Sequence, residues 1–97
     1  MPKGYIIGEI EITNLERYEN YRSQSPDLIA QFGGRFIVRG GEAQLLEGEG
    51  DVKRVVVIEF DSYERAVAFY NSSAYQAILP HRLENSKAPR LICVAGV

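Results

Sequence analysis

The strongest constraint on the fold is an apolar run near the middle of the chain, Val55 to Phe60, which contains a single carboxylate at Glu59. Successive side chains of a strand point to opposite faces of the sheet, so this run is apolar on both faces. Such a strand needs cover above and below it. The chain has too little predicted helix to cover both faces. We therefore expect a partner, a ligand or both to cover the second one.

Length and composition predict one ordinary globular domain. A chain of 97 residues can bury one core, and we expect a single domain over residues 1–97. The net charge of −2 and the lack of a basic stripe argue against a nucleic-acid partner. No signal peptide precedes the first strand, and no apolar run approaches the ~20 residues of a membrane helix. With Cys93 as the only cysteine, these features predict a soluble cytoplasmic protein without a membrane partner.

Hydrophobic periodicity predicts the order of strands and helices. The predicted strands cover residues 5–12, 35–39, 54–60 and 91–97, with a short additional strand over 42–47. The predicted helices cover residues 15–32, with a break near Ser25 caused by Pro26, then 63–70, then a short helix from Ser73 that Pro80 ends or kinks. Three capping-box patterns place the N-caps at Thr13, Asp61 and Ser73.

This order of elements predicts the fold class. Strand–helix–strand crossovers within one sheet are right-handed, which puts both helical segments on the same side of the sheet. The product is an α+β, ferredoxin-like sandwich, with an antiparallel sheet and helices on one face.

The other face of this sheet is left without helices. Strand parity places Ile6, Ile10, Ile12, Phe36, Val38, Val56, Ile58 and Phe60 under the helices, and Tyr5, Ile7, Glu9, Glu11, Arg35, Ile37, Arg39, Val55, Val57 and Glu59 on the open face. Sizeable apolar patches usually mark interfaces. We therefore expect a two-fold homodimer through the open sheet face, with the two sheets facing each other.

A set of short motifs resembles a known family. These are the run from Gly33 to Gly41, the pair Glu47-Gly48, the run from Val57 to Phe60, and the pattern Ala66-x-x-Phe69-Tyr70-x-Ser72-x-x-Tyr75-Gln76. The combination, which covers nearly the whole chain, resembles the family catalogued as domain of unknown function 1330. The resemblance implies a dimeric α/β barrel. Structural kin of that family include cofactor-free monooxygenases, decyclising enzymes and lactone isomerases. Where that family often has proline after the Ser72 position, this chain has Ser73.

Arg39 and Glu59 form the most informative pair of charged residues, because strand parity predicts that both face the same interior. Arg39 is expected to bind a ligand carboxylate or enolate, and Glu59 to orient that arginine or to act as a base. Glu9 could join the pair. The alternative is a structural ion pair inside or across the dimer.

His81 and the tyrosines complete the set of candidate site residues. His81 is the only histidine and is therefore the candidate acid–base group near neutral pH; the alternative is a surface histidine near a helix end. Tyr5, Tyr70 and Tyr75 are candidates for pointing hydroxyls into a cleft, although tyrosines at helical spacing also serve as core residues.

These residues support three functional hypotheses. The first is an enzyme that acts on a small anionic or aromatic metabolite without a metal or an organic cofactor. The second is a small-molecule binder that uses a pocket between sheet and helices or near the dimer seam, without turnover. The third is a purely structural homodimer whose interior charges set its register.

Overall fold

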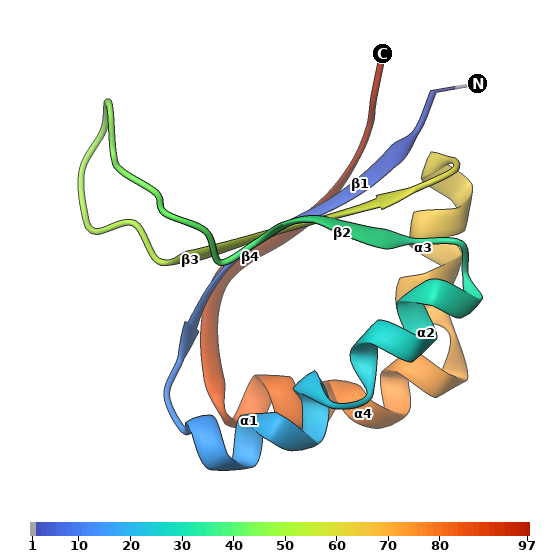
Figure 1. Cartoon of the computed structure of the whole chain (residues 1–97), viewed down its shortest axis with the longest axis horizontal. Helices are drawn as coiled ribbons and strands as arrows, with labels where there is room; N and C mark the ends of the chain where they lie inside the picture. Colours follow the sequence, from blue (N-terminus) through green and yellow to red (C-terminus); the bar gives the residue numbers. More distant parts are fainter. Residues whose placement is uncertain (1) are drawn as a thin grey trace.

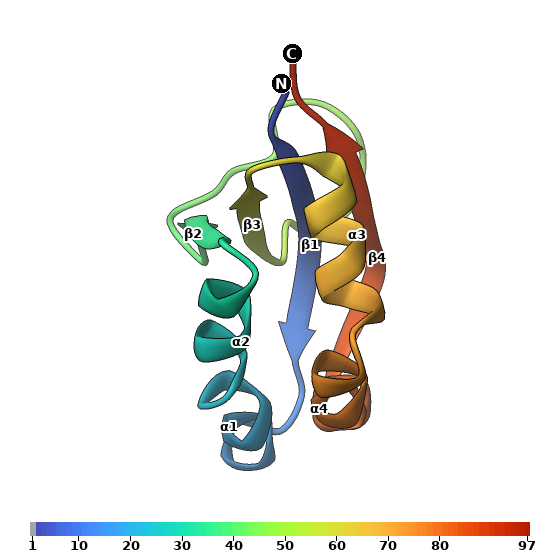
Figure 2. The same ribbon diagram turned by 90° about the vertical axis from the view of Figure 1, so that its right-hand side faces the viewer.

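The computed structural model describes residues 2–97, with the side chains of residues 88 and 89 excepted. The elements are β1 (Gly4–Ile12), α1 (Leu15–Arg22), α2 (Ser25–Gln31), β2 (Arg35–Arg39), β3 (Arg54–Phe60), α3 (Tyr63–Asn71), α4 (Ser73–Glu84) and β4 (Ser86–Ala95). Figures 1 and 2 show the four helices on one side of the sheet.

The sheet confirms the predicted α+β, ferredoxin-like sandwich. Its four strands lie in the order β2-β3-β1-β4, and every neighbouring pair is antiparallel. The sheet of the single chain is open and does not close into a barrel. The strand predicted over residues 42–47 is wrong, because these residues belong to an irregular segment that projects beyond the sheet (Figure 1).

Each predicted N-cap is displaced by one residue. The caps are Asn14, Ser62 and Ser72, whose side-chain oxygens accept hydrogen bonds from backbone N–H groups three residues later. The N–H of Thr13 donates to the carbonyl of Asn85 at 2.9 Å, which holds Thr13 in the segment that leaves β1. The capping patterns therefore locate these helices but not their first residues.

Pro26 and Pro80 have different effects on the helices that contain them. Pro26 lies in the first turn of α2, and the predicted break is confirmed, since α1 ends at Arg22 and α2 begins at Ser25. Pro80 lies inside α4 on an exposed position, and the helix continues to Glu84 instead of ending there. The last strand begins at Ser86, earlier than the predicted start at Leu91.

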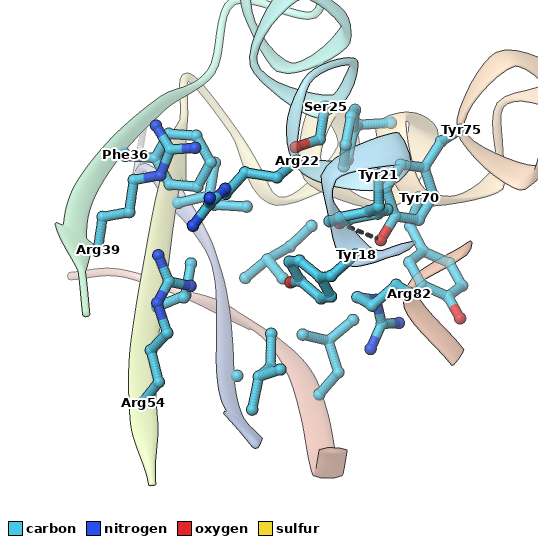
Figure 3. Close-up of a pocket in the computed structure, with 17 residues that line it drawn as sticks. Tyr18, Tyr21, Arg22, Ser25, Phe36, Arg39, Arg54, Tyr70, Tyr75 and Arg82 are labelled. Carbon is cyan, nitrogen blue, oxygen red and sulfur yellow. Dashed lines mark hydrogen bonds between the residues drawn. The ribbon is translucent and has the colours of Figure 1, made fainter. Parts of the chain in front are cut away.

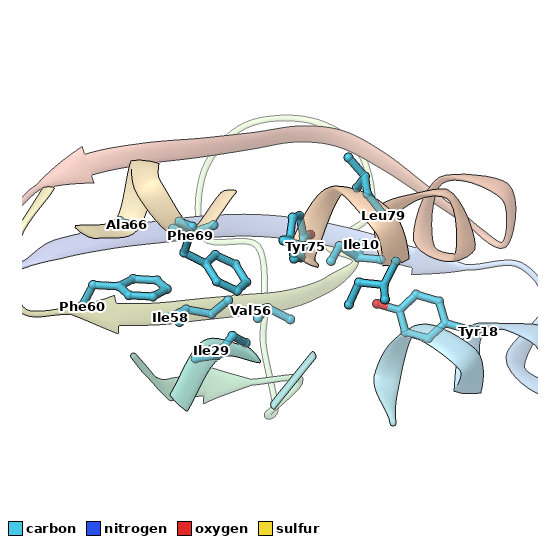
Figure 4. Close-up of a cluster of buried hydrophobic side chains, with 12 residues drawn as sticks. Ile10, Tyr18, Ile29, Val56, Ile58, Phe60, Ala66, Phe69, Tyr75 and Leu79 are labelled. Carbon is cyan, nitrogen blue, oxygen red and sulfur yellow. The ribbon is translucent and has the colours of Figure 1, made fainter. Parts of the chain in front are cut away.

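The core lies between the helices and the covered face of the sheet (Figure 4). The strand residues predicted for this face, Ile6, Ile10, Val56, Ile58 and Phe60, are buried there. Aromatic rings from the helices pack on them, and the ring centroids of Phe60 and Phe69 lie 5.3 Å apart. The parity prediction is thus confirmed for β1 and β3.

A β-bulge in β2 breaks the parity of that strand. Phe36 pairs with Ile58, but Val38 pairs with Val57 and Arg39 with Val56, which leaves Ile37 as an extra residue. Val38 therefore lies on the open face and is 40 % exposed, whereas Arg39 lies on the helix side. Both residues are on the face opposite to the predicted one.

Candidate functional site

A pocket opens between the helix side of the sheet and the helices (Figure 3). Besides apolar side chains from the sheet, its lining has four arginines and four tyrosines, namely Arg22, Arg39, Arg54, Arg82, Tyr18, Tyr21, Tyr70 and Tyr75. The free space amounts to ≈ 580 Å³ when the open mouth is included, and ≈ 40 Å³ of it accommodates the centres of water-sized molecules.

The mouth of the pocket is formed by Arg39 and Arg54, on β2 and β3. The guanidinium carbon of Arg39 lies 4.2 Å from the centroid of the Phe36 ring, a cation–π contact that holds the side chain over the sheet. The side chain of Arg54 crosses Gly40. A Cβ at Gly40 would lie 2.6 Å from Arg54 Nε, and the φ of +70° also favours glycine there. Gly40 therefore makes room for Arg54.

The opposite end of the pocket is formed by Arg82 of α4, which is 3 % exposed. Its Nε is buried and has no hydrogen-bond partner in the described structure. An arginine stays protonated under all ordinary conditions, so this end of the pocket holds a buried positive charge. Figure 3 shows Arg82 and the tyrosine cluster on one side of the pocket, with Arg39 and Arg54 on the other.

Two tyrosine hydroxyls lie beside Arg82 (Figure 3). The hydroxyl oxygens of Tyr21 and Tyr75 are 2.8 Å apart and share a hydrogen bond. Burial raises the pKa of Tyr21 well above its ordinary value, so this hydroxyl keeps its proton and cannot act as a base at neutral pH. One hydrogen bond between two hydroxyls uses one of their two hydrogens. The second hydrogen is free to be donated to a ligand oxygen.

The pocket carries positive charge without matching carboxylates. Among the described side chains, no aspartate or glutamate lines it. Arg22 pairs with Glu19 outside the pocket. Within residues 2–97 as described, Arg39, Arg54 and Arg82 take part in no ion pair with an acidic side chain. The pocket therefore has the charge and the hydrogen-bond donors to bind an anion.

The structure separates the predicted site residues into two groups. Arg39, Tyr70 and Tyr75 line the pocket, whereas Tyr5, Glu9 and Glu59 come from the open face. The predicted placement of Arg39 and Glu59 on one face is wrong, because the bulge at Ile37 turns Arg39 to the helix side.

Glu59 forms a different set of contacts on the open face. The hydroxyl of Tyr5 donates to Glu59 Oε2 at 2.9 Å, and Arg35 forms an ion pair with Glu59 Oε1. The hydrogen bond from Tyr5 lowers the pKa of Glu59, and the charge of Arg35 adds to this effect. Glu9 accepts a hydrogen bond from the backbone N–H of Lys53 at 2.7 Å. The charges of the open face are thus mostly paired.

His81 is half-buried on α4 and lines none of the described pockets. Its backbone carbonyl accepts a hydrogen bond from the Asn85 side chain at 2.8 Å. The catalytic roles considered for His81 and Glu59 stay predictions, and the structure does not bring the two residues together.

Sequence reasoning missed Arg82, although a signal for it exists. The buried positions of α4 are Tyr75, Ile78, Leu79 and Arg82, which follow the i, i+3, i+4, i+7 spacing of an apolar helix stripe. A charged residue at such a position is exceptional, because arginine is almost never fully buried unless it is paired.

Two further properties bear on the site. Within the described residues, no group of three or more His, Cys, Asp or Glu side chains is arranged to hold a metal ion. None of the helices in residues 2–97 combines the length and the hydropathy needed to cross a lipid bilayer.

Known structures share this fold. The RPA0582 protein of unknown function from Rhodopseudomonas palustris superposes with a TM-score of 0.75 at 19% identity, over 99% of this chain and 83% of that one. HapK from Hahella chejuensis gives a TM-score of 0.64 at 12% identity, over 97% and 92% of the two chains. A candidate antibiotic biosynthesis monooxygenase from Nitrosomonas europaea gives 0.53 at 13% identity, over 99% and 90%. At these identities the likeness shows the fold alone.

The sequence comparisons place the chain in a family. None of the curated proteins matches it. The family model described as domain of unknown function (DUF1330) matches residues 3–97, and the chain therefore belongs to that family.

Proposed function

We propose that the protein is a homodimer whose protomers each bind a small organic molecule in the pocket between sheet and helices. The observation that carries this proposal is the unpaired positive charge in that pocket, which Arg39, Arg54 and Arg82 line together with tyrosines and without a carboxylate among the described side chains. Ligand sites typically combine an apolar wall with a few convergent polar groups, and this pocket does so.

The homodimer is proposed from the open face of the sheet. The exposed fractions of its large apolar side chains are 50% for Ile37, 40% for Val38, 43% for Ile92 and 42% for Val94. The same face carries charges of both signs, including Arg35 and Glu59. A surface that mixes apolar side chains with both charges is complementary to a second copy of itself across a two-fold axis. A dimer of facing sheets would complete the barrel that the single chain leaves open.

Catalysis without a metal or an organic cofactor is a second candidate function. It is favoured by the hydroxyl pair of Tyr21 and Tyr75 beside a buried guanidinium. Such donors stabilise negative charge that develops on a substrate oxygen. The fold of the candidate monooxygenase from Nitrosomonas europaea is compatible with this function but does not imply it.

A thermal-shift screen of small carboxylates, aromatic acids and their neutral amides tests the binding function. We expect acids that carry a second acceptor group to raise the melting temperature of the wild type more than that of Arg39→Ala. Arg17→Ala serves as the control, because Arg17 is exposed on α1 and does not line the pocket. A panel that leaves the melting temperature unchanged would contradict the binding function.

Two further measurements test the remaining parts of the proposal. Light scattering after size exclusion should give the mass of a dimer for the wild type and for Arg39→Ala. For any acid that binds, proton NMR of the acid in D₂O with and without protein tests catalysis. New signals or hydrogen exchange would establish turnover, and an unchanged spectrum would leave a binder.

A further inference from the structure

We infer that the ligand is an organic acid with two separated oxygen-bearing groups, a carboxylate bound at Arg82 and a second acceptor group bound at Arg39 and Arg54. This inference rests on the proposed binding function and specifies the chemical class of the ligand.

The carboxylate is assigned to Arg82 because of its burial. Arg82 is 3 % exposed and its Nε has no partner. A buried charge is costly unless an opposite charge and hydrogen bonds compensate it. The fork of a guanidinium matches the two oxygens of a carboxylate, and the hydroxyl pair of Tyr21 and Tyr75 offers a further hydrogen. Every polar group identified at this end can donate to an acceptor oxygen.

The second acceptor group is assigned to the mouth because the positive charges of Arg39 and Arg54 lie on the side of the pocket opposite to Arg82. Arg39 is exposed and Arg54 half-buried, and each is held in place, Arg39 over Phe36 and Arg54 across Gly40. Apolar side chains of the sheet, among them Ile10 and Val56, also line the pocket. A ligand that spans the pocket therefore needs an apolar middle and polar ends.

The size of the pocket agrees with this division. The cavity volume is ≈ 40 Å³, whereas the space including the open mouth is ≈ 580 Å³. A longer ligand must extend into the open mouth, where Arg39 and Arg54 lie. An inorganic anion would occupy only one of the two ends.

Isothermal titration calorimetry with straight-chain dicarboxylates of increasing length tests the inference. Each dicarboxylate is compared with the monocarboxylate of the same length and with its neutral diamide, and inorganic phosphate is included as a compact anion. We expect affinity to peak at one chain length, where the dicarboxylate binds about tenfold more tightly than its monocarboxylate, since a charge-assisted hydrogen bond contributes about that much. Diamides should bind far more weakly.

Two substitutions separate the two ends. Arg82→Met, which preserves volume, should weaken both acids by about 100-fold, as expected for loss of a buried charged partner. Arg54→Gln should lower the affinity of the best dicarboxylate to that of its monocarboxylate and leave the monocarboxylate unchanged. Arg17→Gln is the matched surface control and should change neither affinity.

The melting temperature of the unliganded protein gives an independent result. Arg82→Met removes a buried charge that no acidic side chain pairs, but it also removes the contact with Tyr75 that helps to raise the pKa of Arg82 above its ordinary value. The two effects oppose each other, so the variant should melt close to the wild type. If Arg82 instead has a structural role, the variant melts lower, and the inference is overturned.

The remaining outcomes distinguish this inference from the proposed function. Equal binding of diamides and diacids, or tightest binding of phosphate, would overturn the inference while leaving a binding pocket. A lack of saturable binding by every compound would overturn both.

Discussion

The two faces of the sheet differ in whether their charged side chains are paired. On the open face, Glu59 accepts from Tyr5 and pairs with Arg35, so its charge is compensated within the chain. On the helix side, Arg82 is more deeply buried, yet no acidic side chain among the described residues pairs with it. Paired charges are compatible with a surface that packs against another protein. Under the proposed function, a ligand supplies the partner that the unpaired charges of the pocket lack.

This contrast shows why burial and pairing must be considered together. An ion pair such as Arg35–Glu59 can fix the register of an interface without any ligand. A buried guanidinium without an acidic partner is costly unless hydrogen bonds compensate it, and a fold tolerates such a cost where binding requires it. The proposed function therefore depends on Arg82, the buried charge that no acidic side chain among the described residues pairs.

The largest expected effect tests the open face. Ile92→Asp places a carboxylate at a position that is 43% exposed in the single chain and buried in the proposed dimer. Burying an unpaired carboxylate costs several kcal/mol, so we expect a monomer in light scattering at micromolar concentration. Leu83→Asp is the control, because Leu83 is 58% exposed on α4, away from the sheet. If Ile92→Asp and Leu83→Asp have the same mass as the wild type, the open face is not the interface.

The next effect concerns the hydroxyl pair in the pocket. Tyr75→Phe or Tyr21→Phe leaves the other hydroxyl without its 2.8 Å partner. Each single variant should lose about 1–2 kcal/mol of unfolding free energy in urea, because a buried polar group is left unsatisfied. The double variant should lose less than the sum of the two single losses. Strictly additive losses would show that the two hydroxyls do not interact.

A smaller effect is expected from alanine substitutions at Gly40 and Gly50. Comparing the two distinguishes the cost of backbone strain from the loss of space for the Arg54 side chain. Gly40 and Gly50 both have positive φ, but only Gly40 has the Arg54 side chain within reach of a new Cβ. Alanine at either position should cost about 1 kcal/mol of unfolding free energy through strain. Only Gly40→Ala should also weaken acid binding, measured by calorimetry. Equal affinities in the two variants would remove Arg54 from the site.

The smallest effect is a pH dependence on the open face. The hydrogen bond from Tyr5 lowers the pKa of Glu59 from its ordinary value of 4.5, so the ionised form stabilises the folded state. This contribution is present above that value and is lost as the pH falls through the lowered pKa. Tyr5→Phe should raise the pKa of Glu59, measured by NMR titration of the side-chain carboxyl carbon. An identical titration midpoint in the wild type would contradict the Tyr5 contact.

Much of the fold follows from the sequence by simple rules. The alternation in residues 5–12 and 54–60 predicts the buried residues of β1 and β3, because a regular strand keeps its parity. The right-handed crossover rule then places the helices on one face. The bulge at Ile37 is different, since one inserted residue reverses the parity of all that follow it. No local sequence signal located it, and Arg39 was consequently assigned to the wrong face.

The candidate site was harder to predict than the fold, because it combines residues from distant segments. Arg22, Arg54 and Arg82 are far apart in the sequence, and only the packing of α1 and α4 on the sheet brings them to one pocket. The buried position of Arg82 was available from the α4 stripe. Its lack of a partner was not, because pairing depends on the three-dimensional arrangement of every acidic side chain.

The most direct test of the central claim is the NMR signal of the Arg82 Nε–Hε group during titration with the best-binding acid. Compensation of the buried guanidinium by a bound carboxylate predicts that this signal shifts saturably and that its exchange with water slows, while the exposed Arg17 signal stays unchanged. An Arg82 signal that stays fixed while the acid binds would show that the anion lies elsewhere and would contradict the account.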